Sequence, residues 1–283
     1  MAHMSSWPAT VRQLPTAADW LAATEALRAI HPVLMNVAGS VAEDVAAGTR
    51  YDSELWLVVE EAATVVGCAL RTAPHPTLLS PMRDEDALVL GGWLATYAPS
   101  SGSLTGPAEV VNQVAIGMGR ATTIRMREVI RVLGGLRAPA PCAGSWRAAS
   151  VEDLGLLRRW FANFHSEAGL IVAPREDRIR ASIDEGRLFL WETDLPVAMA
   201  GHATIVATPG GRVGRIGPVY TLPERRRQGY GAAVTHAVAT LLSGRCDQVM
   251  LFADADNPAS NSVYARLGFT VAAELVEADL GEA

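Results

Sequence analysis

Apolar side chains recur at helical or alternating spacing along most of the chain, and this pattern predicts its elements. Apolar residues three or four positions apart predict helices at 17–30, 84–97, 107–119, 151–167, 230–243 and 258–267. Alternating or β-rich runs predict strands at 55–60, 64–70, 123–133, 145–149, 187–192, 197–207, 212–221, 248–254 and 269–275. Two stretches with prolines or glycines and no apolar periodicity, 74–81 and 99–106, are predicted to be loops.

The order of predicted elements restarts about halfway along the chain. Residues 138–144, APAPCAG, carry two prolines and small side chains without periodicity, which is typical of a linker. On both sides the chain runs from a helix to an antiparallel hairpin and then to helix–strand units. We therefore predict an α/β (α+β) fold of two related domains, residues 1–140 and 145–283. Each is expected to form a mixed, mostly antiparallel sheet flanked by helices.

Composition narrows the partners of this fold. The 283 residues are 49% hydrophobic, which is enough for a sizeable core. The net charge of −6 argues against a general nucleic-acid binder, which would more often be basic. No apolar run approaches the roughly 18 residues that a membrane span requires, and the start of the sequence does not resemble a secretory signal. We therefore expect a cytoplasmic protein with neither a membrane nor a nucleic-acid partner, as a monomer or an oligomer.

The types of reactive side chain exclude further classes. The chain has no lysine, so all 24 basic residues are arginines, and chemistry that depends on a Schiff base or a P-loop lysine is excluded. Cys68, Cys142 and Cys246 are odd in number and widely spaced, so neither a zinc site nor a disulfide framework is indicated. No metal is expected.

Residues 223–231, PERRRQGYG, lie between a predicted strand and a predicted helix. Gly229 and Gly231 allow a tight turn and the close approach of an anion to backbone N–H groups at the start of a helix. Three consecutive arginines, 225–227, raise the local potential. This loop therefore predicts a phosphate site, with a pyrophosphate as the natural guest.

The strand that leads into this loop is interrupted by Gly217-Pro218. Proline cannot donate a hydrogen bond to a neighbouring strand, so we expect a bulge or a separation of two strands at this position. Such a separation would expose backbone groups of Val219 and Thr221 to an extended ligand that contains amides.

The helix predicted at 258–267 carries a polar stripe. Asn257-Pro258 is typical of a helix start and Gly268 of a helix end. Asn257, Asn261 and Tyr264 share one face, because they are spaced i, i+4 and i+7. A second stripe of Ala259, Val263 and Leu267 is expected to face the core. Because the helix follows a strand directly, the polar stripe is expected at the carboxyl edge of the sheet, where ligands of α/β proteins bind.

Together these two segments resemble the GNAT superfamily of N-acyltransferases. Arg226-x-x-Gly229-x-Gly231 resembles its pyrophosphate-binding motif, and 257–269 resembles its second motif, with Ser260 where alanine is commoner. The resemblance covers about residues 145–283. It implies two GNAT-like domains, with splayed central strands in the C-terminal one that take the pantetheine of acetyl-CoA. Residues 1–140 carry neither motif and resemble a degenerate copy, to which no CoA site is assigned.

The resemblance also implies roles for individual residues. Tyr264 is expected to protonate the departing CoA sulfur, since a phenol's ordinary pKa of about 10 is near or above that of a thiol. The residues implied to bind the cofactor are Val219, Tyr220, Thr221, Arg226, Arg227, Gln228, Gly229, Tyr230, Gly231, Ala232, Asn257, Ser260 and Asn261.

The general base is less well defined by the sequence. His202 lies on a predicted strand, and Glu192 and Asp254 end strands near the expected cleft. We name His202 and Glu192 as the catalytic candidates beside Tyr264, and a chain of water molecules stays an alternative. Trp160 and Trp191 belong either to the core or to the wall of an acceptor pocket.

The sequence thus predicts a CoA-dependent N-acetyltransferase that acts on a primary amine of a small molecule or peptide. A non-catalytic acyl-CoA sensor or scaffold is the alternative. A nucleotide-binding domain of Rossmann type is disfavoured, because no Gly-x-Gly-x-x-Gly follows the first predicted strand.

Overall fold

The computed structural model describes residues 9–170 and 175–282. The chain divides into two compact units, each described here by itself. The first contains Met1–Glu128, Val206–Gly211 and Ala273–Ala283, and the second contains Val129–Ile205 and Arg212–Ala272. This division by compactness differs in its limits from the domains predicted at 1–140 and 145–283, which stay a prediction.

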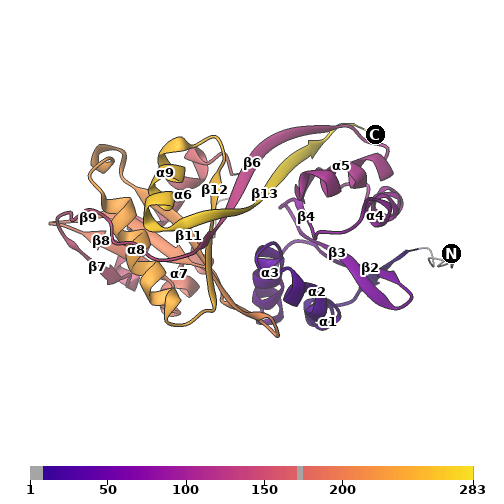
Figure 1. Ribbon diagram of the computed structural model, residues 1–283, viewed down its shortest axis with the longest axis horizontal. Helices are drawn as coiled ribbons and strands as arrows, with labels where there is room; N and C mark the ends of the chain where they lie inside the picture. Colours follow the sequence, from indigo (N-terminus) through magenta and orange to yellow (C-terminus); the bar gives the residue numbers. More distant parts are fainter. Residues whose placement is uncertain (1–8, 171–174, 283) are drawn as a thin grey trace. The chain divides into compact units, whose positions relative to one another are not determined.

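The first unit holds three short helices, a hairpin and two further helix–strand pairs (Figure 1). Its elements are β1 (Thr10–Leu14), α1 (Ala17–Ala23), α2 (Glu25–Ile30), α3 (Asn36–Ala46), β2 (Glu54–Glu61), β3 (Thr64–Thr72), β4 (Thr77–Leu79), α4 (Asp84–Tyr97), β5 (Ser103–Gly106), α5 (Ala108–Gly117) and β10 (Val206–Thr208). Two long strands, β6 (Thr122–Leu133) and β13 (Phe269–Leu280), contribute residues to both units.

The second unit holds both predicted motifs (Figure 1). Its elements are β7 (Ser145–Ala148), the 3₁₀ turn η1 (Val151–Asp153), α6 (Leu154–Glu167), α7 (Glu176–Asp184), β8 (Leu188–Glu192), β9 (Pro196–His202), β11 (Gly211–Thr221), η2 (Pro223–Arg225), α8 (Tyr230–Ser243), β12 (Gln248–Asp254) and α9 (Pro258–Leu267).

The strand order is similar in the two units. It is β1-β2-β3-β4-β5-β13-β6 in the first and β13-β6-β12-β11-β9-β8-β7 in the second. In each unit one central pair is parallel, β4 with β5 and β11 with β12. The pairs β1–β2, β2–β3, β7–β8, β8–β9 and β9–β11 are antiparallel. The predicted fold class, mixed and mostly antiparallel sheets flanked by helices, is confirmed.

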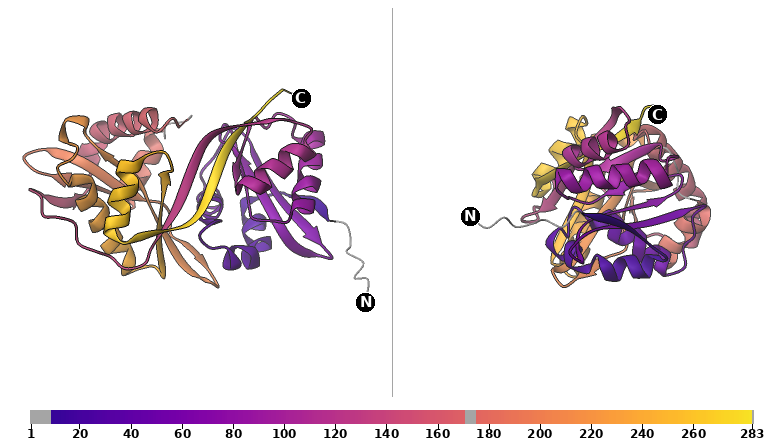
Figure 2. Two further views of the ribbon diagram at one scale, coloured as in Figure 1. Left: turned by 45° about the horizontal axis from the view of Figure 1, so that its top comes forward. Right: turned by 90° about the vertical axis from the view of Figure 1, so that its right-hand side faces the viewer.

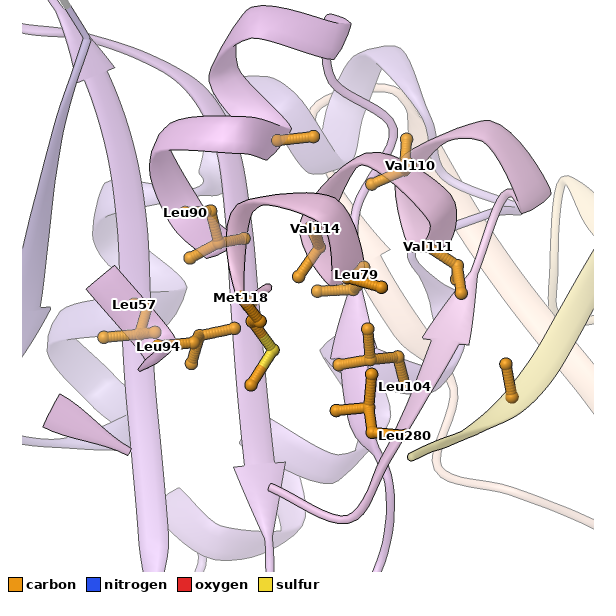
Figure 3. Packing of buried hydrophobic residues seen from close by; sticks show 14 of the residues in the cluster. Leu57, Leu79, Leu90, Leu94, Leu104, Val110, Val111, Val114, Met118 and Leu280 are labelled. Carbon is orange, nitrogen blue, oxygen red and sulfur yellow. The ribbon is translucent and has the colours of Figure 1, made fainter. Parts of the chain in front are cut away.

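One core of the first unit packs α1, α2 and α3 against β2 and β3, and another lies between its sheet and the pair α4 and α5 (Figure 3). Leu90 and Leu94 of α4 and Val114 of α5 are fully buried there. The parallel pair β4–β5 stays closed beneath them. A Cβ built on Gly106, at the end of β5, would lie only 3.0 Å from the Leu79 Cβ at the end of β4.

Helices cover both faces of the second unit's sheet (Figures 1 and 2). Leu157 of α6 and Ile179 of α7 pack with Tyr220 of β11 on one face. Val234 of α8 and Tyr264 of α9 pack with Ile216 of β11 on the other. Side chains of β11 therefore contact the helices on both faces of the sheet. These contacts hold the strand in place relative to both helical layers.

Several local predictions were wrong. The helix predicted at 17–30 breaks at Thr24, where the backbone leaves helical geometry (ψ 4°) and the side chain bonds to the Trp20 carbonyl at 2.7 Å. The predicted loops 74–81 and 99–106 contain the short strands β4 and β5, because pairing within the sheet overrides local turn signals. The predicted strand 197–207 divides into β9 and β10. The elements β1, α3 and α7 were not predicted.

Candidate active site

The sheet of the second unit opens between β11 and β12. Their parallel pairing runs from Val213 opposite Gln248 to Ile216 opposite Leu251. Beyond this point β11 continues to Thr221 and pairs only with β9. The opening begins at Gly217-Pro218, where proline has no N–H to donate. The predicted separation of two central strands is thereby confirmed.

The same position carries the predicted bulge. Ile216 lies opposite His202 of β9 and Val219 lies opposite Ala200, so the register shifts by one residue between them. Ile216 and Val219 therefore face the same layer, although they are three residues apart. The bulge thus turns Val219 and Thr221 toward α8 and Tyr220 toward α6.

The loop after β11 presents unpaired backbone N–H groups at the start of α8. The first bond of the helix is donated by Ala233 to the Gly229 carbonyl at 3.0 Å. The N–H groups of residues 227–232 have no hydrogen-bond partner within the described chain. Free N–H groups at a helix start, with the helix dipole behind them, form an anion site.

Two glycines shape this loop. Gly229 is the N-cap residue and adopts the left-handed conformation (φ +91°) that glycine tolerates best. A Cβ built on Gly231 would lie 3.1 Å from the Thr221 hydroxyl, closer than ordinary contact. Both small residues therefore keep the backbone between the end of β11 and α8 accessible.

The polar side chains of the loop differ in how they are engaged. Arg226 donates to the Thr221 carbonyl at 3.1 Å and to Glu167 of α6 at 2.5 Å. Gln228 donates weakly to the Glu224 carbonyl at 3.5 Å. Arg227 is exposed, whereas Tyr230 is buried in the core and Ala232 is half-buried. Because Arg227 is exposed to solvent and Tyr230 is packed in the core, the backbone N–H groups of the loop are the groups best placed to contact a ligand.

The start of α9 is held by its own amides. Asn257 caps the helix by accepting the Ser260 N–H at 3.1 Å, as predicted from Asn257-Pro258. Asn261 donates to the carbonyls of Asp254 at 2.7 Å and Asn257 at 2.8 Å. Its side-chain oxygen accepts from Arg131 of β6 at 3.0 Å. Asn261 therefore fixes the turn between β12 and α9, and Asn257 is the more exposed of the two amides.

Tyr264 lies on the buried side of α9 and not on its polar stripe. Its ring packs edge-on to Phe269, with 6.3 Å between centroids, and only 9% of the residue is exposed. The helix buries Tyr264 and Leu267, whereas Ala259 is exposed, so the predicted assignment of these two stripes was wrong. Burial raises the pKa of Tyr264 to about 12, so the phenol stays protonated at neutral pH.

His202 ends β9, opposite Ile216, the last residue of β11 that pairs with β12. Its ring is buried and stacks on Phe189 at 6.2 Å. Nδ1 lies 2.8 Å from the Ala203 carbonyl, while Nε2 is buried and has no hydrogen-bond partner within the described chain. Burial lowers the pKa of His202 below its ordinary value, which favours the neutral ring with a free lone pair on Nε2.

The two carboxylates considered as bases are already engaged. Glu192, at the end of β8, accepts from Arg147 at 2.6 Å, and Arg147 also binds Asp153. Asp254 is exposed and accepts the Asp256 N–H at 2.8 Å. Neither arrangement leaves a carboxylate as free of partners as His202 Nε2.

Two clefts flank the sheet of the second unit. The larger has a volume of about 760 Å³, and Trp160 and Asn163 of α6 lie in its wall with Leu222. The smaller, of about 460 Å³, lies beside the outer face of α8 and is lined partly by Trp191. Trp191 also donates to the Ala143 carbonyl at 2.8 Å, which holds the segment predicted as a linker against this unit. A role for either tryptophan toward an acceptor stays a prediction.

Sequence reasoning missed several residues that organise the site. Glu167 binds Arg226, Arg131 binds Asn261, and Asn163 donates to the Tyr220 hydroxyl at 3.3 Å. These contacts join residues 57 to 130 positions apart, so no local pattern signals them.

The described residues contain neither a membrane-spanning helix nor a cluster of metal ligands. Among the residues that the structure describes, no helix is both long enough and apolar enough to cross a bilayer. Within the same residues, no three His, Cys, Asp or Glu side chains come together as a metal site requires. The expectations of a cytoplasmic protein without a metal stay predictions.

Comparison with known proteins supports this architecture. Residues 198–277, which include β11, the glycine loop and α9, match the FR47-like protein family. A mycothiol acetyltransferase from Amycolatopsis mediterranei is 37% identical over 117 residues, 38% of this chain and 38% of the relative. Another from Nocardioides sp. is 31% identical over 161 residues, 56% of this chain and 50% of the relative. The matches thus span half or less of the length of these curated relatives.

Solved structures match over nearly the whole chain. A GNAT-family acetyltransferase from Colwellia psychrerythraea has a TM-score of 0.61 at 12% identity, covering 96% of this chain and 100% of that chain. A tandem GNAT protein from the clavulanic acid biosynthesis pathway has a TM-score of 0.60 at 13% identity, covering 97% and 99%. At such identities these likenesses describe the fold alone.

Fold and site together define an α/β protein with an opened parallel strand pair and a helix start whose N–H groups are unpaired. Residues 198–277 match the FR47-like family, and the fold of the chain is similar to that of solved GNAT-family structures.

Proposed function

We propose that the chain transfers the acetyl group of acetyl-CoA to a primary amine of a small molecule or peptide. One observation carries the proposal. The strand β11 loses β12 as a partner after Ile216, ends at Thr221 and leads through the turn η2 to the unpaired N–H groups of residues 227–232. An opening for an extended amide chain is thereby continuous with an anion site, and these are the two parts of CoA that a protein must recognise.

The residues present fit such a donor. The backbone of Val219 and the N–H group of Thr221 offer amide partners along the opening, whereas the Thr221 carbonyl is held by Arg226. The loop N–H groups offer donors to a pyrophosphate. Gly231 keeps the two parts in reach of each other, because a side chain there would crowd Thr221. The exposed amide of Asn257 and the Ser260 position complete the predicted contacts from α9.

Acetyl-CoA supplies an activated acyl carbonyl. Transfer forms a C–N bond and breaks a C–S bond, so the chain must accept one proton from the amine and supply one to the sulfur. Tyr264 suits the second task because its raised pKa keeps it protonated, and a backbone N–H near Val219 suits the carbonyl oxygen.

His202 is the preferred base of the two candidates. Its neutral ring leaves Nε2 without a partner in the described chain, and His202 stands opposite Ile216, where the pairing of β11 with β12 ends, whereas Glu192 would first have to leave Arg147. Its burial means that the acceptor proton reaches it directly or through an intervening water. Glu192 remains the second candidate.

We infer that the acceptor is a small molecule. The relatives that match over part of the chain are named mycothiol acetyltransferase, and this name favours a small-molecule acceptor. The net charge of −6 is compatible with a cationic amine.

A thiol-release assay across a broad panel of amines, with mass spectrometry of the products, tests this function. The expected result is release of free CoA in step with the appearance of an acetylated amine. Binding of CoA without thiol release for any acceptor would instead identify an acyl-CoA sensor or scaffold.

A further inference from the structure

Arg226, the arginine at the head of the glycine loop, is already occupied by groups of the chain itself. Its Nη2 donates to Glu167 Oε2 at 2.5 Å, and its Nε donates to the Thr221 carbonyl at 3.1 Å. Its guanidinium carbon lies 5.8 Å from the centre of the Tyr220 ring. Because Tyr220 packs against Trp160, the arginine is turned toward the α6 layer of the sheet.

Glu167 stands at a position that is unfavourable for a carboxylate. It is the last residue of α6, where the helix dipole carries partial negative charge. A neutral or basic residue at this position would interact more favourably with the helix dipole. The compensating contact is the ion pair with Arg226, which lies 59 residues further along the chain.

This ion pair is open to exchange. The side chains of Arg226 and Glu167 are 43% and 46% exposed, so solvent and a dissolved anion can reach both groups. The unpaired N–H groups of the loop begin at the residue that follows Arg226. A phosphate held by these groups would compete with the Glu167 carboxylate for the same guanidinium.

We propose that the Glu167 carboxylate competes with the phosphates of the donor for Arg226 and thereby lowers the affinity of the site for its donor. The inference rests on the proposed function, since it requires an acyl-CoA at the loop. When the donor binds, Arg226 exchanges a carboxylate for a phosphate, and the ion pair lost in the exchange reduces the net gain. The donor consequently binds less tightly, and is released more readily, than it would if Arg226 had no carboxylate partner before binding.

Glu167→Gln tests this directly, because it keeps the length of the side chain and removes its charge. Exposed ion pairs contribute little, so the dissociation constant for CoA is expected to fall about two- to fivefold. The affinity of the variant should also decline more steeply with added salt. The reason is that donor binding to the variant forms an ion pair between Arg226 and phosphate without breaking the pair with Glu167, so salt screening acts on a net gain of one pair.

The chain offers a matched control. Glu176, at the start of α7, pairs with Arg158 of α6 at 2.9 Å, and the two side chains are 54% and 65% exposed. Glu176→Gln therefore removes the same charge from a similar ion pair that does not involve the loop. Its affinity for CoA should equal that of the wild type. In an Arg226→Gln background, Glu167→Gln should have no further effect.

Isothermal titration with CoA at two salt concentrations, on the full chain, separates the outcomes. Tighter binding by Glu167→Gln, with Glu176→Gln unchanged, supports the inference, and Glu167→Ala should act in the same direction. Equal or weaker binding by both Glu167 variants overturns it and leaves the proposed function intact. A wild-type chain that binds no CoA overturns the proposed function itself.

Discussion

Gly231 of α8 lies against Thr221, the last residue of β11. A Cβ built on Gly231 would stand 3.1 Å from Thr221 Oγ1, which is tighter than most real contacts. The strand that leaves its partner and the helix start proposed to bind the phosphates therefore meet at one small residue. Access to the proposed donor site depends on this contact.

Gly231→Ala should weaken CoA binding about tenfold, equivalent to about 1.4 kcal/mol. The added methyl forces Thr221 or the loop to shift by a few tenths of an ångström, which displaces the N–H groups that hold the phosphates. Alanine favours a helix, so thermal stability should change little. Titration calorimetry measures the affinity.

Gly244→Ala is the matched control for this change, at the other end of the same helix. A Cβ there would meet only the Leu241 carbonyl, at an ordinary 3.7 Å. Its CoA affinity should match the wild type. Unchanged affinity in Gly231→Ala would show that phosphates are not held at this loop.

Tyr264→Phe should lower kcat strongly while leaving the dissociation constant for acetyl-CoA nearly unchanged. The substitution keeps the ring that packs on Phe269 and removes the proton donor for the sulfur. Steady-state kinetics and calorimetry on the same preparation separate the two effects. Wild-type turnover in the variant would remove Tyr264 from the acid role.

Tyr264 should also make the fold sensitive to alkali. Burial raises its pKa from about 10 to about 12, so the stability that the neutral phenol contributes is present below pH 10 and is lost as the pH rises toward 12. The difference in unfolding free energy between wild type and Tyr264→Phe should therefore narrow or reverse across this window. Chemical denaturation at several pH values measures it, and parallel profiles would contradict the assigned pKa.

His202→Gln should abolish an acid limb in the dependence of kcat/KM on pH. Burial lowers the pKa of His202, so the neutral ring persists at pH 7 and is protonated only below its ordinary range near 6.5. The same sign applies to stability, since the contribution of the neutral ring is lost as the pH falls through the folded-state pKa. Glu192→Gln is the comparison, and loss of the limb there alone would make Glu192 the base.

One chain should bind one CoA. In the first unit β4 and β5 stay paired, Gly106 lies against Leu79, and the helix that follows begins with Asp84 and Glu85, which disfavour an anion. Arg83, the nearby cation, is held by Asp86 at 2.9 Å. Calorimetric stoichiometry tests this, and two sites of similar affinity would contradict the reading of the first unit as degenerate.

Much of the second unit could be predicted from the sequence because its signals are local. The helices α8 and α9 and the strand β12 have the predicted limits, since Gly229, Asn257-Pro258 and Gly268 mark helix ends by conformation and capping. The break at Gly217-Pro218 was predictable for the same reason, because proline removes a donor whatever surrounds it.

The remainder depends on contacts that local patterns do not contain. Tyr264 has the same helical spacing as Asn257 and Asn261, yet its ring is buried. A tyrosine ring is largely apolar, so it packs into a core when the neighbouring elements form one. The helix α7 was missed because only Ile179 and Ile183 mark its buried face. The partners of Arg226 and Asn261 come from α6 and β6, and only the folded chain brings them together.

A crystal structure of the chain with bound CoA tests the central claim most directly. The account predicts pantetheine amides on the backbone of β11 at Val219 and Thr221, pyrophosphate oxygens on the N–H groups of residues 227–232, and the thiol beside Tyr264. CoA bound away from the β11–β12 opening, or a pyrophosphate elsewhere than at the start of α8, would contradict it.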